Sequence, residues 1–371
     1  MKLLKVVANN FKLCEDNFTI CFVPTARKTE EDKEYELQEI DENLFVFNTL
    51  AFVGKNASGK TTTMELLSFV YDILSNFRIK NNINLITEDL NIDITFYNEG
   101  ILYHYVSDIK KRVDNVLFSN QRLFSKKYIK TGFNDIFNYD KYEEIIYNDE
   151  LPEDTSILFR VLKKISIRGV YFKSQDVTGD SFDFAFDLYD ILKDVKPNLI
   201  KRVLKLYDEH ISNIEKKDNE TFKITYNNNK SYVVNGHELF SILSSGTTKG
   251  LTLFSFVILS LHNGFDLIID EIENHFHRTL VENIILLYKD KKINKNNASI
   301  IITTHYPELL DLFNRSDNVY VTKYDKKIHL ENLNFDYNVR SELLKSKKFF
   351  QNAYGTNISY EALMEFKEEL M

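Results

Sequence analysis

The sequence predicts an α/β fold in which buried parallel strands alternate with helices, and a mostly helical segment is inserted between the two halves of this pattern. An apolar stretch at 50–53 ends in a glycine-rich turn and is followed by apolar residues at helical spacing. Two further apolar runs, at 265–269 and 300–302, also end in polar side chains. The chain from about residue 112 is charged and helical in character, and the alternation of helix and strand resumes near residue 236.

Composition restricts the class of protein. With 371 residues, the chain is long enough for one large domain with an insertion or for two domains. A hydrophobic content of 43%, with 29 Phe and 21 Tyr, can fill a sizeable core and excludes a disordered protein. Only 4 Pro and 11 Gly favour long regular elements over extended linkers.

Charge and cysteine content bear on partners and compartment. The net charge of −8 does not favour a surface coated for nucleic acid, although a local basic groove stays possible. Cys14 and Cys21 are the only cysteines, which excludes a disulfide framework and a cysteine-based zinc site. The first residues lack the apolar run of a signal peptide, and the longest apolar stretch, Leu251–Leu261, is too short to span a membrane. We therefore expect a soluble cytoplasmic protein with no membrane partner.

The first lobe is expected to be rich in strands. Three β-rich segments, "LLKVVANNF", "NFTICFV" and "NLFVFNTLAFV", precede residue 57, and the charged stretch Lys28–Asp41 between the last two is expected to be a solvated loop. The two β-rich segments that flank Asn98–Gly100 predict a hairpin.

The middle of the chain is expected to be helical. A stripe of apolar residues at spacings of four and three predicts a helix that begins after Pro197 and Asn198, and its members are Ile200, Leu204, Tyr207, Ile211 and Ile214. An ordinary amphipathic helix is favoured over a projecting coiled-coil arm. A second hairpin is expected around Asn227–Asn229. We divide the chain into an N-terminal lobe at 1–111, a mainly helical insertion at 112–235 and a C-terminal lobe at 236–371.

The stretch "FVGKNASGKTTTMELL" carries the strongest motif. Gly54 and Gly59 lie five positions apart and are followed by Lys60 and Thr61, which fits G-x-x-x-x-G-K-[ST]. Glycines let such a loop turn its N–H groups around a phosphate, and the helix that follows adds the partial charge of its N-terminus. Lys60 is expected to reach the β/γ-phosphates, and the Thr61 hydroxyl to hold Mg²⁺. The candidate phosphate contacts are Gly54, Asn56, Ala57, Ser58, Gly59, Lys60, Thr61 and Thr62.

Two polar strand ends follow further along the chain. In "FDLIIDEIENHFH", Asp270 can hold Mg²⁺ and the adjacent Glu271 can polarise an attacking water as general base. In "ASIIITTHYPELL", His305 can hydrogen-bond the γ-phosphate or that water. A lone histidine after a strand is more often structural, but its position one strand after the carboxylate pair favours the catalytic interpretation.

The segment "SILSSGTTKG" opens a second apolar helix. Ser244, Ser245 and Gly246 are small residues at a helix N-terminus, where an anion can bind. In a single chain this site would be redundant with the glycine-rich loop. It is explained if it faces the nucleotide of another protomer.

With these four motifs in this order, residues 1–110 and 236–371 resemble the ABC/SMC/RecF-like ATPase superfamily. "LSSGT" is similar to the LSGGQ-type signature at Ser244 and Gly246, whereas Ser245 and Thr247 depart from it. "DEIENHFH" resembles the D-E-I-E-N-x-x-H form of stand-alone AAA-type ATP-binding proteins from prokaryotic defence loci and of overcoming-lysogenization-defect nucleases. His277 then occupies the D-loop position.

The resemblance implies further site residues. "TTHYPELL" is similar to the switch-histidine motif, and "AYGTNIS" resembles a tail found in the same group. The turn Asn9–Lys12 is similar to one near the ribose and adenine, which makes Asn10 and Lys12 candidate nucleotide contacts. Gln121 in "SNQRLF" is the candidate Q-loop residue and Mg²⁺ ligand.

The fold implied is an ABC-type (SMC/RecF-like) P-loop ATPase head with a mostly helical insertion, and ATP and Mg²⁺ are the implied cofactors. The resemblance implies an ATPase that forms a head-to-tail homodimer, or a higher even oligomer, and regulates a separate nuclease or toxin in antiviral, abortive-infection defence. A RecF/SMC-like DNA-binding repair ATPase is the alternative. A transporter motor is disfavoured by the long insertion and by the signature. The chain lacks the N-K-x-D motif of a GTPase, and too few residues follow His305 for a TOPRIM nuclease domain.

Overall fold

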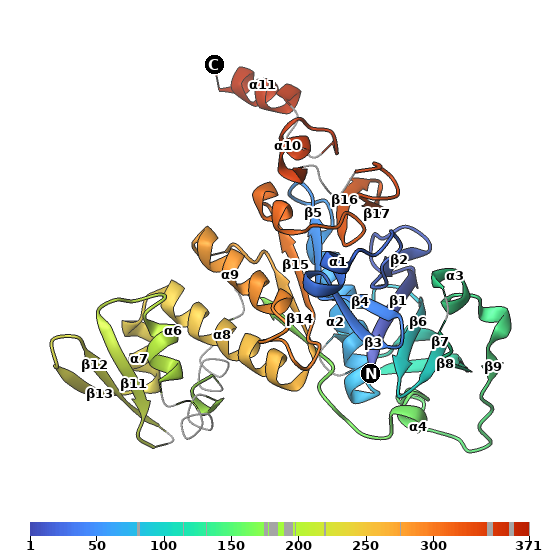
Figure 1. Cartoon of the computed structure of the whole chain (residues 1–371), viewed down its shortest axis with the longest axis horizontal. Helices are drawn as coiled ribbons and strands as arrows, with labels where there is room; N and C mark the ends of the chain where they lie inside the picture. The colour runs from blue at the N-terminus through green and yellow to red at the C-terminus, as the bar shows by residue number, and fades with distance from the viewer. Residues whose placement is uncertain are drawn as a thin grey trace.

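The computed structural model describes most of the chain as an α/β head with a smaller lobe at one side (Figure 1). The described residues are 1–79, 82–113, 115–130, 132–173, 177, 185–188, 196, 198–218, 220–274, 276–339, 344–355 and 360–370.

The core sheet has the strand order β10-β14-β15-β5-β16-β17. Its strands are β10 (Gly169–Lys173), β14 (Asp266–Asp270), β15 (Ile300–Thr304), β5 (Thr49–Val53), β16 (Val319–Asp325) and β17 (Lys327–Asn332). Neighbouring strands from β10 to β16 run parallel, and β17 returns antiparallel to β16. The expected parallel core is confirmed.

A second sheet is antiparallel throughout, with the order β2-β1-β6-β7-β8-β9. Its strands are β2 (Phe18–Cys21), β1 (Lys2–Asn9), β6 (Leu90–Asn98), β7 (Ile101–Lys111), β8 (Val116–Lys127) and β9 (Glu143–Glu144). Two small antiparallel sheets are made of β3 (Leu37–Asp41) with β4 (Leu44–Phe47), and of β11 (Ile211–Lys216), β12 (Thr221–Tyr226) and β13 (Ser231–Asn235).

The described α-helices are α1 (Glu30–Tyr35), α2 (Lys60–Asn76), α3 (Phe133–Ile136), α4 (Phe159–Leu162), α6 (Leu199–Leu204), α7 (Gly236–Ile242), α8 (Ser245–Asn263), α9 (Arg278–Lys289), α10 (Lys345–Phe350) and α11 (Tyr360–Glu369). Short 3-10 helices are η1 (Ile83–Leu85), η2 (Tyr139–Lys141) and η4 (Pro307–Leu312). No single described helix is long and apolar enough to cross a membrane, and α7 and α8, which pass that test only as a pair, meet at a bend of 116°.

The core sheet is covered on both faces. Leu50 and Phe52 of β5 belong to the apolar cluster that contains α2, whereas Ala51 and Val53 belong to the cluster that contains α8 and α9. Successive residues of a strand point to opposite faces, so burial of both faces produces the continuous apolar runs in the sequence. The carboxyl ends of β5, β14 and β15 meet at one edge of the sheet, where the motif residues are found.

The expectation of a solvated loop at Lys28–Asp41 is wrong. This stretch contains α1, which Thr29 and Asp32 begin with a capping box, and the strand β3. Glu36 is fully buried and pairs with Lys289 of α9. The sequence pattern suggests that the charge of Glu36 is exposed to water. In the folded chain, the distant Lys289 compensates this charge.

The expectation of a mainly helical insertion at 112–235 is also wrong for long parts of it. Residues 116–127 form β8 of the antiparallel sheet, and 169–173 form the edge strand β10 of the core sheet. The register of β8 against β7 shifts between Val106 and Asp108, and buried side chains change from Val116 and Phe118 to Leu123. This shift breaks the alternation that identifies a strand in the sequence.

The helix expected from Ile200 to Ile214 ends at Leu204. Ile211 and Ile214 instead lie on β11, where a register shift after Ile211 places two residues three apart on the same buried face. A bulge therefore imitates helical spacing. The start signal at Pro197 lies outside the described residues. The hairpins at Asn98–Gly100 and Asn227–Asn229 are confirmed as β6–β7 and β12–β13.

Candidate active site

The glycine-rich loop packs tightly against the far edge of the core sheet. Gly59 has a φ of +104° and precedes α2. A Cβ atom built there would lie 2.3 Å from Ile328 Cγ2, and one at Gly54 would lie 2.4 Å from Thr322 Oγ1. Only glycine fits these two positions. Ser58 is buried and its Oγ is 2.6 Å from Thr322 Oγ1, so β16 and β17 hold the loop from below.

The upper side of the loop is open. Asn56 and Ala57 are exposed at its tip, and Ala57 has a φ of 58°. Thr61 is exposed and Thr62 is half-buried in the first turn of α2. The first N–H groups of a helix have no partner within that helix. Of the expected phosphate contacts, Asn56, Ala57 and Thr61 are exposed, whereas Gly54, Ser58 and Lys60 are buried.

Lys60 folds back over this loop. Its Nζ donates to the carbonyls of Gly54 at 2.9 Å and Lys55 at 3.0 Å, and the residue is only 5% exposed. Burial lowers the pKa of the Lys60 ammonium to about 8, while the carboxylates of Asp270, Glu271 and Glu273 oppose the shift. A buried cation next to an exposed loop tip and the N-terminus of a helix is suited to an anion.

Asp270 joins the ends of three elements. Thr61 Oγ1 of α2 donates to Asp270 Oδ2 at 2.8 Å, and Thr303 Oγ1 of β15 donates to Asp270 Oδ1 at 2.7 Å. Tyr171 of β10 donates to Oδ2 at 3.4 Å. Mg²⁺ prefers oxygen ligands and is commonly held by one or two protein groups together with phosphates and waters. The adjacent hydroxyl of Thr61 and carboxylate of Asp270 fit this donor set.

Glu271 is held in a fixed position beside His305. Its φ is +48°, a left-handed conformation that costs a non-glycine residue roughly 1–3 kcal/mol. The N–H of Glu271 donates to Thr303 Oγ1 at 2.6 Å, and Asn274 Nδ2 donates to its carboxylate. Glu271 Oε1 lies 3.4 Å from His305 Nε2. The two residues expected to act on the attacking water are therefore brought together.

Glu273 ties the ends of β14 and β15 from the other side. Its Oε1 accepts the N–H of His305, and its Oε2 is buried without a hydrogen-bond partner among the described residues. Sequence reasoning missed Glu273 and Thr303 as site residues. The signal for Thr303 is its position, since it directly ends an apolar strand two residues before His305.

The turn after β1 lies beside α2. Asn10 and Lys12 both have a positive φ, and Asn10 Nδ2 donates to the carbonyl of Asp89 at 3.2 Å. Lys12 forms an ion pair with Glu65 on the second turn of α2. The same turn bonds through Glu15 to Ile328, the residue packed against Gly59. These contacts hold the turn beside α2 and close to the residue that packs against Gly59.

The signature residues begin α8 and are not at the glycine-rich loop of their own chain. The segment expected as a turn before the helix is its first turn: Ser244 is the N-cap, its Oγ accepts from the Thr247 N–H at 3.1 Å, and Ser245 is the first helical residue. Ser244 and Ser245 are exposed and Gly246 is half-buried. Figure 1 shows the start of α8 beside α7, well apart from β5 and the start of α2.

The contact that the structure gives His277 is made within its own helix, α9. His277 is the exposed N-cap of α9, and its Nδ1 accepts from the N–H of Thr279 at 3.3 Å. The tail "AYGTNIS" falls partly outside the described residues, which stop at Gly355 and resume at Tyr360.

The assignment of Gln121 as a metal ligand is not supported by its surroundings. Gln121 lies on β8, where its Oε1 accepts from the Tyr105 hydroxyl and the Ile157 N–H and its Nε2 donates to the Thr155 carbonyl. All of these partners belong to the antiparallel sheet and its flanking loop. The strand beside β14 is β10, and the glutamine that follows it in the sequence, Gln175, lies outside the described residues.

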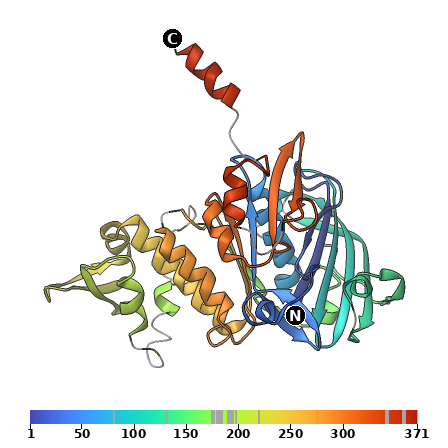
Figure 2. The same cartoon turned by 45° about the horizontal axis from the view of Figure 1, so that its top comes forward.

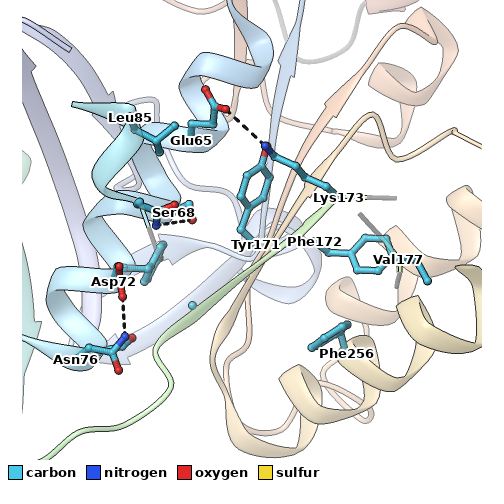
Figure 3. Close-up of a pocket in the computed structure, with 14 residues that line it drawn as sticks. Glu65, Ser68, Asp72, Asn76, Leu85, Tyr171, Phe172, Lys173, Val177 and Phe256 are labelled. Atoms are coloured by element: carbon cyan, nitrogen blue, oxygen red, sulfur yellow. Dashed lines mark hydrogen bonds and ion pairs between the residues drawn. The ribbon is translucent and has the colours of Figure 1, made fainter. Parts of the chain in front are cut away.

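A cavity of about 410 Å³ runs along the side of α2, next to β10 (Figure 3). Glu65 of α2 faces Lys173 of β10 across it, at 3.5 Å, and Phe256 of α8 closes the opposite side. The cavity is lined by no residue of the glycine-rich loop, although Tyr171, which lines it, also contacts Asp270.

The chain is similar, at low sequence identity, to several solved structures. The chain is similar to the SMC head domain from Thermotoga maritima, with 13% identity, 90% of this chain and 99% of that chain covered and a TM-score of 0.42. It is similar to an SMC head bound to the C-winged helix domain of ScpA, with 14% identity, coverage of 91% and 99% and a TM-score of 0.45. A third is cbiO1 from Clostridium perfringens, part of the ABC transporter complex cbiONQ, with 13% identity, coverage of 90% and 96% and a TM-score of 0.33. No curated protein matches the chain.

The chain also matches a protein-family model. Residues 50–311 match the family described as "AAA domain, putative AbiEii toxin, Type IV TA system". This segment is well over half of the chain and contains the glycine-rich loop, Asp270, Glu271 and His305. The match and the site geometry agree with an ATP-binding, ATP-hydrolysing P-loop protein. The chain belongs to this family of AAA ATPases.

Proposed function

We propose that this ATPase closes as a head-to-tail dimer around two ATP molecules and thereby controls a separate effector protein in abortive-infection defence in the cytoplasm. The proposal of a dimer rests on one observation, the position of the signature residues Ser244 and Ser245. Ser244 and Ser245 are exposed at the start of α8, and their contacts are made within that helix rather than with the glycine-rich loop. An anion site of this kind has a use if it faces the ATP of a second chain.

The residues of the site support a direct hydrolytic step. The ring of loop N–H groups and Lys60 would hold the β/γ-phosphates, and Glu271 would accept a proton from the attacking water as it bonds to the γ-phosphorus. His305, 3.4 Å from Glu271, would orient the water or the γ-phosphate. Thr61 and Asp270 would hold Mg²⁺, which neutralises phosphate charge when bound.

The defence role rests on the family. Its description names an abortive-infection toxin of a toxin–antitoxin system. The described residues supply an ATP site and a side lobe, and we assign the toxic or nucleolytic step to a partner protein. The opening and closing of the dimer would then transmit the nucleotide state to that partner.

The dimer is tested by measuring mass in solution. Glu271→Gln keeps the shape of the side chain and removes the base, so hydrolysis should fall by about 10²–10⁴-fold while ATP still binds. Light scattering should show that Mg²⁺-ATP raises the mass of Glu271→Gln above that of the nucleotide-free protein, and the added change Ser244→Arg should return it to the nucleotide-free mass. A Glu271→Gln protein that does not change mass on adding Mg²⁺-ATP argues against the dimer.

The defence role is tested in cells. The gene expressed with its chromosomal neighbours should reduce phage plating, and both Glu271→Gln and Lys60→Met should remove the protection. Equal phage titres with and without the intact set of genes would contradict this part of the proposal.

A DNA-binding repair ATPase is the second candidate, and one observation favours it. A hollow of about 580 Å³ beside α6 is lined by Lys201, Arg202, Lys205 and neutral polar side chains, with no acidic residue. If phosphates bind there, duplex DNA should be bound at 50 mM salt and released at 200 mM, and Lys201→Glu with Lys205→Glu should abolish the binding. A lack of binding at 50 mM salt excludes this candidate.

A further inference from the structure

Three helices of the side lobe border an apolar groove. Its walls come from α6, the second half of α8 and the end of α9 with the turn that follows, and its volume is about 730 Å³. Within it Leu206 is 54% exposed and Ile293 is 45% exposed. Figures 1 and 2 both show α8 and α9 side by side there. The groove uses residues 254–262 of α8, the half of the helix away from the signature residues.

The rim of this groove is positively charged. Lys196, Arg202, Lys292 and Lys295 line it and are exposed, and no acidic side chain is among the lining residues. None of the four has an ion-pair partner within the part of the chain that the structure describes. The chain has a net charge of −8, so the positive charge of this rim is opposite in sign to that of the whole chain. An apolar groove with a positive rim favours a partner with an apolar face and acidic flanks.

The chain itself carries a helix with this chemistry. α11 extends away from the head in both views (Figures 1 and 2). Phe366 of α11 and Leu370, the residue directly after this helix, are four positions apart and are 60% and 71% exposed. Glu365, Glu368 and Glu369, at i, i+3 and i+4, are exposed and lie along one flank of the helix, with Glu365 and Glu369 bordering the apolar face. An amphipathic helix with an exposed apolar face is unpartnered in this state.

We propose that α11 of a second copy of this chain docks into the groove between α6, α8 and α9, with Phe366 and Leu370 toward its apolar floor and its glutamates toward the lysine and arginine rim. A second copy is favoured over the same chain because of where the two surfaces lie. Figure 1 shows α11 extending from the end of the head near β16 and α10, whereas the groove is in the side lobe.

This contact goes beyond the proposed function because it needs no nucleotide. The composite ATP site would use the start of α8, and the groove uses the other half of the same helix. A chain could therefore hold one neighbour through ATP and exchange α11 with the same or another neighbour. The contact is tested without nucleotide and again in the Lys60→Met background. Its failure can then be distinguished from a failure of the ATP-dependent dimer.

Cysteine pairing tests the contact directly. Purified Ile293→Cys protein is mixed with Phe366→Cys protein under mild oxidation, with distinguishable tags and without ATP. We expect a disulfide-linked heterodimer of twice the chain mass. The matched control replaces Ile293→Cys by Ile146→Cys, at an 80% exposed isoleucine far from the groove in sequence, and should give at least tenfold less product.

Three results would overturn the proposal. One is a heterodimer yield no higher than that of the Ile146→Cys control. The second is a double variant, Ile293→Cys with Phe366→Cys, whose thiols are consumed while its mass stays that of one chain, since this assigns α11 to the groove of its own chain. The third is pairing that is lost in Lys60→Met protein, which would make the contact a consequence of ATP binding.

A charge exchange tests the rim. Lys292→Glu with Lys295→Glu should lower the heterodimer yield about tenfold, and Glu365→Lys with Glu368→Lys on the partner should restore it, because the complementary signs are re-established. Lys111→Glu with Lys127→Glu, at exposed lysines of the antiparallel sheet, should leave the yield unchanged. If the groove variants do not fold, the two changes on α11 alone should still lower the yield. Yields that do not respond to either pair contradict the docking.

Discussion

Thr303 is the residue on which both carboxylates of the site depend. Its hydroxyl donates to Asp270 Oδ1 at 2.7 Å and accepts the N–H of Glu271 at 2.6 Å. We expect Thr303→Val to leave ATP affinity nearly unchanged and to lower kcat by up to about 10²-fold, because Glu271 is displaced from its reacting position. Steady-state ATPase assays and calorimetry check this. Thr303→Ser should keep most of the activity, and a valine variant with wild-type kcat would show that Thr303 has no positioning role.

Replacing Lys60 should weaken ATP binding without destabilising the fold. Lys60→Met should reduce ATP affinity by at least about 10²-fold, since an ion contact with phosphate is lost from a desolvated site. The melting temperature of the nucleotide-free protein should stay the same or rise, because burial opposes the charge of Lys60. Lys55→Met, at an exposed lysine of the same loop, is the control. Unchanged ATP affinity in Lys60→Met would remove the phosphate-loop assignment.

The residues that could be predicted are those whose chemistry is local in sequence. Gly54, Gly59, Lys60 and Thr61 follow from fixed spacing, and Asp270 follows from its place at the end of an apolar run. Their partners could not be predicted in the same way. Thr322 and Ile328, which close the loop from β16 and β17, lie more than 260 positions from it, and no spacing rule links them.

At the scale of elements, α10 is held on η4 by a buried lysine. Lys345 Nζ donates to the carbonyl of Phe313 at 2.6 Å, and burial lowers the pKa of the Lys345 ammonium from 10.5 to about 8. Because the folded pKa lies below the unfolded value, the unfolded chain binds more protons between pH 8 and 10.5. The contribution of this group to stability therefore rises with pH across that window.

Replacing this lysine tests the packing of α10. Lys345→Met should raise the free energy of unfolding at pH 7 by about 1–2 kcal/mol, because removal of a buried charge outweighs one lost hydrogen bond. The gain should vanish near pH 10, where the wild-type amine is already neutral in the folded state. Denaturant titrations at the two pH values measure it. Lys347→Met, at an exposed lysine of α10, should change little, and a destabilised Lys345→Met at pH 7 would contradict the argument.

Gln121 provides a test of the antiparallel sheet. Its amide joins Tyr105 of β7 to the loop at Thr155 and Ile157. Gln121→Ala should therefore lower stability by about 1–3 kcal/mol while the ATPase rate at 25 °C is retained. Thermal unfolding and ATPase assays on the same preparation decide between this role and metal binding. A stable variant that has lost its Mg²⁺-dependent activity would restore the original assignment.

Element types were predictable where a strand is buried on both faces or where a turn is short. β5, β14 and β15, with α2 and the two hairpins, are found where the sequence patterns indicate them. β8 and β11 were missed because a register shift in each breaks or imitates periodicity. α1 and the adjoining β3 were missed because Asp32 of α1 and Glu36, between the two elements, are compensated by ion pairs with distant residues.

At the scale of the whole molecule, the two halves of the predicted ATP site are far apart in one chain. α8 is 19 residues long and therefore roughly 28 Å from end to end, with the signature residues at its outer end. The core strands meet the glycine-rich loop at the other side of the head (Figure 1). A single chain thus has the groups for binding ATP and lacks the cap that the signature would supply.

The measurement that tests this account most directly is the ATPase rate of a mixture of Ser244→Arg and Glu271→Gln proteins. Each variant alone should be inactive and should bind ATP with nearly wild-type affinity. The melting temperature of Glu271→Gln should be close to that of wild type. Ser244→Arg should lose about 1 kcal/mol of stability, because Ser244 is the N-cap of α8. In a head-to-tail heterodimer, one composite site carries both defects and the other carries neither. The equimolar mixture should recover half of the wild-type rate multiplied by the measured fraction of chains in heterodimers, since each heterodimer has one working site of two.

The control mixes Ser244→Arg with a Ser244→Arg, Glu271→Gln double variant and should stay inactive. Recovery in the first mixture together with inactivity in the control is the result that shared sites predict. Normal hydrolysis by Ser244→Arg alone would contradict the account, as would a fully inactive first mixture in which heterodimers are shown to form.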